Sequence, residues 1–159
     1  QTTAYGSDKT MKKEELLTIL GPTAVGKTEL SVYLAKILGS SIISGDAFQV
    51  YRGMDIGTAK VTKEEADGIF HYLVDCMEPE ESYSAAIFQE KAREYISKEN
   101  KKDKIPILIG GTGLYVQGLF RRICFFTKSR RPKQVVHLLV RCRGKKDWRM
   151  HLRNFFLKR

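Results

Sequence analysis

The sequence lacks the features of a membrane or secreted protein. No apolar run is long enough to cross a bilayer, and the N-terminus has no secretory signal pattern. Its three cysteines are odd in number and show no C-x-x-C spacing, which argues against a disulfide framework or a zinc site. No internal repeat is visible. We therefore expect a cytoplasmic protein without a membrane partner, and 159 residues suffice for one domain with its own core.

Acidic residues are nearly absent from the end of the chain. Residues 121–159, called the basic tail below, contain 14 Lys or Arg and one acidic residue, Asp147. Residues 1–120 contain 14 basic and 17 acidic residues, so the net charge of +10 comes from the basic tail. Arg and Lys interleaved with Phe and Trp suit RNA binding, although a segment translated in the wrong reading frame can look equally basic.

A phosphate-binding loop is the strongest motif in the chain. An apolar run at 16–20 predicts a buried strand and leads into GPTAVGKT, which fits G-x-x-x-x-G-K-[ST]; Leu30, Leu34, Ile37 and Leu38 follow at helical spacing. In such a loop, backbone N–H groups and a helix N-terminus face an anion, Lys27 adds a charge, and the Thr28 hydroxyl can bind Mg²⁺. We expect a di- or triphosphate on Gly21, Pro22, Thr23, Ala24, Val25, Gly26, Lys27 and Thr28.

The rest of the pattern alternates strands with helices. Further strands are predicted at 41–44, 71–75 and 105–109, and helices at 61–68, 84–98 (capped by Ser82 or Ser84) and 110–120. The alternation predicts an α/β fold, a parallel sheet flanked by helices and P-loop NTPase-like. Ligands bind at the carboxyl ends of such strands, so the loops at Gly21, Asp46 and Gly110 should share one rim. In the basic tail, whose structure is left open, a strand at 135–140 and an amphipathic helix at 147–158 are conceivable.

Asp46 stands where a predicted strand gives way to a loop on this rim. A carboxylate in that place can orient a nucleophile beside the bound phosphate and accept its proton. Taken alone, a turn-forming or capping aspartate is the commoner case. The residues by themselves leave both interpretations open.

Four segments together resemble the tRNA dimethylallyltransferase family: GPTAVGKT, GDAFQVYRGMDIGTAK, the YSAAIF helix and IPILIGGTGLY. The phosphate loop alone is shared by many NTPases, whereas the second segment is far more specific. The resemblance runs from about Leu16 to Phe120. It implies an enzyme that transfers a dimethylallyl group from dimethylallyl diphosphate to N6 of an adenosine next to the anticodon, with the tRNA anticodon stem-loop as partner and Mg²⁺ as cofactor.

The resemblance also implies a role for each matching residue. The loop from Gly21 to Thr28 would hold the diphosphate, with Lys27 on its oxygens and Thr28 on Mg²⁺, and Asp46 would engage the adenine N6 amino group. The stretch Asp46, Ala47, Phe48 and Gln49 resembles the family's tRNA-contacting segment. Thr112 would be a further contact near the reacting groups, or a helix N-cap alone. The adenine would have to flip out of its stack to react.

The chain departs from the family after Phe120. Family members are about twice as long, and none of their continuing pattern is found in the basic tail. We hypothesise that the reading frame shifts near 118–122 and that this is a truncated member; reading the gene in its other two frames tests this. Phe70 also stands where the family usually has a proline. We therefore expect a monomer with a disordered leader (1–10), a P-loop α/β transferase core (11–120) and the basic tail (121–159).

Two other functions stay open. A P-loop kinase or NTPase would use Thr28 and Mg²⁺ with ATP, and Asp75, after HYLV, is a candidate Walker-B acid, although no catalytic glutamine or arginine-finger signature is visible. Alternatively, the chain is a basic RNA-binding module with a vestigial loop. In that case RNA binding would depend steeply on salt and would vanish without residues 121–159.

Overall fold

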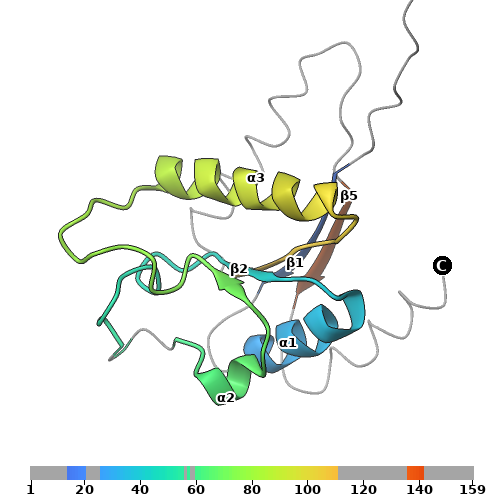
Figure 1. The fold of residues 1–159 in the computed structure, drawn as a ribbon, viewed down its shortest axis with the longest axis horizontal. Helices are drawn as coiled ribbons and strands as arrows, with labels where there is room; N and C mark the ends of the chain where they lie inside the picture. The colour runs from blue at the N-terminus through green and yellow to red at the C-terminus, as the bar shows by residue number, and fades with distance from the viewer. Residues whose placement is uncertain (1–13, 21–25, 56, 58–59, 111–135, 142–159) are drawn as a thin grey trace, which may run out of the picture.

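Five parallel strands form a single sheet in the order β3-β2-β4-β1-β5 (Figure 1). The computed structural model describes residues 14–20, 26–55, 57 and 60–110, together with the backbone of 136–141. The strands are β1 (Glu15–Leu20), β2 (Ile42–Ser44), β3 (His71–Tyr72), β4 (Ile107–Gly110) and β5 (Val136–Arg141). The predicted α/β class with a parallel sheet is confirmed.

Two helices cover opposite faces of this sheet, α1 (Lys27–Leu38) and α3 (Ala85–Lys101) (Figure 1). A short helix, α2 (Lys63–Ala66), begins with a capping box in which Thr62 and Glu65 satisfy each other's backbone N–H groups. The N-cap of α3 is Ser84, whose hydroxyl accepts from the Ile87 N–H at 3.3 Å. This contact decides between the two serines that the sequence offered as caps.

Strand residues alternate between two cores, as expected where both faces of a parallel sheet are covered. On the α3 face, strand side chains join Phe88, Ala92 and Ile96 of the helix; they are Leu16, Ile43 and Leu108. On the α1 face, others join Leu30, Leu34 and Ala35 of that helix; they are Leu17, Ile19, Ile42 and Ile107. Burial on both sides explains why these strands read as apolar runs in the sequence.

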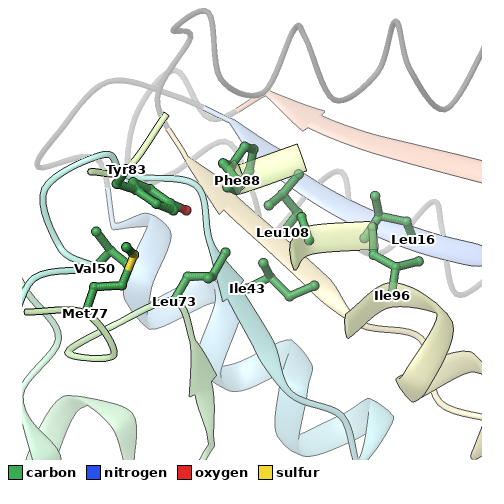
Figure 2. Packing of buried hydrophobic residues seen from close by; sticks show 10 residues of the cluster. Leu16, Ile43, Val50, Leu73, Met77, Tyr83, Phe88, Ile96 and Leu108 are labelled. Carbon is green, nitrogen blue, oxygen red and sulfur yellow. The ribbon is translucent and has the colours of Figure 1, made fainter. Parts of the chain in front are cut away.

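The core on the α3 face continues beyond the sheet into the neighbouring loops (Figure 2). Val50, which is 0% exposed, lies beside Met77 and Tyr83 at one end of this cluster, with Leu73 next to them. The segment just after Asp46 is thereby anchored in the hydrophobic core. Its backbone pairs with a second loop through an isolated parallel bridge between Tyr51 and Met77.

Two details differ from the sequence-based prediction. The third strand was predicted to reach Asp75, but β3 ends at Tyr72, because Leu73 (φ 62°) and Asp75 (φ 50°) have left-handed backbone that no strand accommodates. Of the four apolar residues at helical spacing, Leu30 and Leu34 are buried and Leu38 packs against the core, whereas Ile37 is 50% exposed. The buried stripe of α1 is therefore narrower than its apolar pattern indicated.

The basic tail contributes one strand to the sheet. The strand that the sequence suggested at 135–140 is confirmed as β5, an edge strand that runs parallel to β1 with Val136 opposite Glu15. The predicted leader (1–10) and the predicted helices at 110–120 and 147–158 lie outside the described residues. In the part of the chain that the structure describes, no helix combines the length and apolar character needed to span a membrane.

Candidate active site

The carboxyl ends of β1, β2 and β4 lie at one edge of the sheet, which we call the rim. Two contacts join the rim segments. The Gly45 N–H donates to the Ile109 carbonyl at 2.7 Å, and the Lys27 ammonium donates to the Gly110 carbonyl at 3.2 Å. Asp46, which follows Gly45, and Lys27 therefore approach the end of β4 from two sides. The segments at Asp46 and Gly110 therefore share one rim, as expected, whereas Gly21 lies outside the described residues.

The start of α1 is shaped for an anion. Gly26 has φ 84°, a left-handed conformation that glycine adopts without steric cost, and its carbonyl accepts the first helical hydrogen bond, from the Leu30 N–H at 3.1 Å. No described side chain caps this helix end. The first N–H groups of α1 are therefore oriented toward the rim, where a phosphate can accept from them.

The first turn of α1 carries the two polar residues of the motif that the structure describes. Both Lys27 and Thr28 are half-buried. The Thr28 carbonyl accepts from the Ser31 hydroxyl at 2.8 Å, which ties this turn to a fully buried serine. The other predicted phosphate-loop residues, Gly21, Pro22, Thr23, Ala24 and Val25, lie outside the described residues, as does Thr112.

Asp46 closes a tight turn with one of its two oxygens. Its Oδ1 accepts from the Phe48 N–H at 2.8 Å and from the Gln49 N–H at 3.2 Å. This is the Asx-turn role that is common for an aspartate at such a position. Among the described residues Oδ2 has no hydrogen-bond partner. The turn and the proposed chemistry are therefore compatible, because they use different oxygens of one carboxylate.

Ser44 contacts residues on both sides of this turn, a role that the sequence did not reveal. Its hydroxyl donates to Gln49 Oε1 at 3.0 Å and lies 3.4 Å from the Asp46 nitrogen. Ser44 is the last residue of β2 and is buried. The strand end thus fixes the turn from which Asp46 projects. A small hydroxyl residue at the end of a predicted strand was the only available signal.

Phe48 projects from the same turn and is 61% exposed, whereas Ala47 beside it is half-buried. An exposed aromatic ring next to the rim, where the sequence predicts phosphate binding, suits stacking against a nucleic-acid base. None of the described contacts tests the predicted tRNA role of residues 46–49.

A second polar cluster, which the sequence did not predict, connects the segment after the Asp46 turn to Asp75. The ammonium of Lys60 donates to Asp55 Oδ1 at 2.8 Å, to Asp75 Oδ1 and to the Tyr51 carbonyl. Burial lowers the pKa of Lys60, but the hydrogen bonds and charges of the two aspartates outweigh it and raise that pKa above its usual value. Only 8% of the Lys60 side chain is exposed, although both of its carboxylate partners are largely exposed.

The family model described as IPP transferase matches residues 49–154. The chain belongs to the IPP transferase family. The match begins in the segment after Asp46 and extends into the basic tail, beyond Phe120, where the resemblance in the motifs ended. The hypothesis of a shifted reading frame stays a prediction.

Individual relatives agree with the family match. The tRNA dimethylallyltransferase of Bacillus anthracis is 60% identical over 109 residues, which is 69% of this chain and 35% of that protein. The crystal structure of the full-length tRNA isopentenylpyrophosphate transferase from Bacillus halodurans superposes with a TM-score of 0.66 at 46% identity, over 92% of this chain and 44% of the other. A eukaryotic dimethylallyltransferase acting on tRNA reaches a TM-score of 0.64 at 30% identity over 75% of this chain and 33% of the other. This chain spans about a third of the length of the curated relatives it matches.

The arrangement of strands disfavours the kinase alternative for this member of the IPP transferase family. A Walker-B acid would have to end a strand near β1, but the neighbours β4 and β5 end in Gly110 and Arg141. Asp75 lies beyond the end of β3, which β2 and β4 separate from β1, and its carboxylate accepts from Lys60. The described residues therefore place no acidic strand end beside the start of α1.

Proposed function

We propose that this chain carries the diphosphate-binding and adenine-facing part of a tRNA dimethylallyltransferase. The reaction would transfer a dimethylallyl group from dimethylallyl diphosphate to N6 of an adenosine next to the anticodon. The observation that carries the proposal is the approach of Lys27 and the Asp46 turn to the end of β4 from two sides. The names of the relatives described above point to the same chemistry.

The transfer breaks the bond between the allylic carbon and the diphosphate oxygen and forms a bond from that carbon to N6. Negative charge grows on the leaving diphosphate as the bond breaks. A diphosphate bound at the start of α1 would place this charge beside the first N–H groups of the helix and the Lys27 ammonium. Fixed donors of this kind stabilise a transition state because they need no reorganisation. In this account Lys27 exchanges its contact with the Gly110 carbonyl for a phosphate oxygen.

The adenine N6 amine loses one proton in the transfer, and Asp46 is the group we assign to receive it. Two backbone N–H groups hold Oδ1 in place, which leaves Oδ2 to face the amine. A base held in a fixed orientation within hydrogen-bond reach of the proton accelerates its transfer. The exposed ring of Phe48 would stack on a neighbouring base once the adenine has flipped into the site.

The residues at this rim suit Mg²⁺. The Thr28 hydroxyl is a hard oxygen donor, and Mg²⁺ usually takes few protein ligands and completes its shell with phosphate oxygens and water. When bound, the ion would neutralise charge on the leaving diphosphate. We further propose a monomer located in the cytoplasm.

Transfer of labelled dimethylallyl diphosphate to an anticodon stem-loop RNA tests this proposal. Asp46→Asn keeps an oxygen for the two backbone N–H groups, so the turn should survive while kcat falls about 10²-fold to 10⁴-fold. Lys27→Met should weaken diphosphate binding about tenfold or more, because a charge-assisted contact is lost. Glu29→Gln, in the same helical turn but exposed, is the matched control and should change neither quantity by more than about twofold.

The same assay with ATP separates the competing function. Phosphate release from ATP without any dimethylallyl transfer would favour a kinase or NTPase. Diphosphate affinity that is unaffected by Lys27→Met would contradict the assignment of the rim altogether.

A further inference from the structure

We propose that Lys60 is a positioning residue that holds the Asp46 turn in register with the loop at 73–77, and that it thereby sets the placement of the adenine-facing carboxylate. The inference rests on the function proposed above for Asp46. It starts from the Lys60 cluster, which neither the phosphate-binding rim nor the hydrophobic core accounts for.

The ammonium of Lys60 has three acceptors and uses all its donors. Two are the carboxylates of Asp55 and Asp75, and the third is the Tyr51 carbonyl. An ammonium has three N–H groups, so the set is complete. The Lys60 side chain is 8% exposed, whereas Asp55 and Asp75 are 71% and 52% exposed, so the ammonium is shielded while solvent still reaches both carboxylates. One cation therefore joins three separate points of the chain.

Backbone contacts lead from this cation to the Asp46 turn. The Asp75 N–H donates to the Gln49 carbonyl at 3.0 Å, and the N–H groups of Cys76 and Met77 both donate to the Val50 carbonyl, at 2.9 and 3.0 Å. The Gln49 N–H in turn donates to Asp46 Oδ1. Lys60 thus fixes the carboxylate of Asp75, whose own N–H holds the residue that closes the turn.

The backbone near Asp75 supports the idea that this arrangement serves the site. Leu73 and Asp75 have φ values of 62° and 50°, and left-handed backbone is costly for a branched residue such as leucine. Leu73 is held there by burial in the core beside Val50 and Met77 (Figure 2). Asp75 is held by Lys60. Strained backbone persists where its surroundings determine it, and it concentrates at functional sites.

Arg52 makes a weaker version of the same connection. Its Nε donates to the Asp75 carbonyl at 3.1 Å and its guanidinium pairs with Glu78, but its side chain is largely exposed. Without Lys60, the carboxylates of Asp55 and Asp75 would lose the ammonium that they share, and Arg52 contacts the Asp75 carbonyl rather than its carboxylate. We therefore assign the positioning role to Lys60.

Lys60→Met tests the inference, with Lys63→Met as the control, since Lys63 is exposed and belongs to α2. Hydrogen exchange of the Phe48 and Gln49 amides reports directly on the Asp46 turn. We expect Lys60→Met to speed exchange at these two amides about tenfold or more, while the amides in the middle of α3 stay protected. In the transfer assay, kcat should fall about tenfold with the KM for dimethylallyl diphosphate unchanged within about twofold.

The two arms separate this inference from the function on which it rests. Unchanged exchange at Phe48 and Gln49 in folded Lys60→Met protein would overturn the inference, and so would faster exchange throughout the chain. If exchange changes as expected but wild-type protein transfers no dimethylallyl group, Lys60 still positions the turn and the proposed function fails. In an Asp75→Asn background the effect of Lys60→Met on exchange should shrink, because the main link to the turn is already weakened.

Discussion

Tyr72 and Glu99 form a contact between the edge strand β3 and the helix α3 that no sequence pattern revealed. The Tyr72 hydroxyl donates to Glu99 Oε1 at 2.8 Å, and the Tyr72 ring stacks on Tyr95 with 4.1 Å between centroids. Glu99 is 2% exposed, and its Oε2 has no partner among the described residues. Tyr72 therefore provides the hydrogen bond on which this buried carboxylate depends. Desolvation first, and then Glu99, raises the pKa of Tyr72 to about 12.

Tyr72→Phe should remove the tyrosinate transition near pH 12 from an absorbance titration of the folded protein. The pKa of Tyr72 is about 12 in the folded protein and about 10 in the unfolded chain, so the contact contributes its full stability below pH 10. This contribution is lost as the pH rises from 10 toward 12. The variant should also lose about 1–3 kcal/mol at neutral pH, since a buried acceptor loses its donor. Tyr33→Phe, on the exposed side of α1, should leave the transition near 12 unchanged. Persistence of that transition in Tyr72→Phe would contradict the contact.

At the scale of single elements, the start of α3 offers a paired test. Ser84→Ala should destabilise the protein by about 1 kcal/mol, because the Ile87 N–H loses its capping oxygen. Ser82→Ala, two residues earlier and also exposed, should change the free energy of unfolding by less than about 0.5 kcal/mol. Chemical denaturation of both variants measures the difference. Equal effects would mean that Ser84 is not the cap.

Elements with a strong local signal were predicted well. The apolar runs that became β1 and β4 and the periodic helix α3 with its serine cap all depend on neighbours within a few residues, so their pattern is complete in the sequence. The length of β3 was wrong because its end depends on left-handed backbone at Leu73, which burial of that side chain maintains. Hydrophobic periodicity carries no information about such tertiary constraints.

The site was predictable to a similar degree. The motif indicated Lys27 and its helix, and strand order brought Asp46 to the same rim, because parallel strands end at one edge. Ser44 and Lys60 were missed, since their partners lie in a turn and in a loop whose approach is decided by three-dimensional packing. The Lys60 contact with Asp75 spans 15 residues with no periodic relationship.

At the scale of the whole molecule, β5 decides whether β1 is a central or an edge strand. Six residues of β1 face six of β5 in parallel register, from Glu15 opposite Val136 to Leu20 opposite Arg141. β1 leads directly to the predicted phosphate-binding segment, so exposure of β1 should affect the rim as well as the fold. An exposed apolar edge strand also offers unpaired backbone groups to other chains.

Deleting residues 121–159 should therefore lower the midpoint of thermal unfolding and cause association that grows with protein concentration. Each ladder hydrogen bond contributes about 0.5–1.5 kcal/mol, so the loss of a whole strand should amount to several kcal/mol. Deleting residues 142–159 is the matched control: it removes much of the positive charge but retains β5, and should leave the midpoint within a few degrees. If both deletions unfold at the wild-type midpoint, β5 adds nothing to the sheet, and the core at 11–120 folds without the basic tail. If only the longer deletion is unstable, the basic tail is a structural part of the domain despite its unusual composition, because its contribution then depends on the strand and not on its charge.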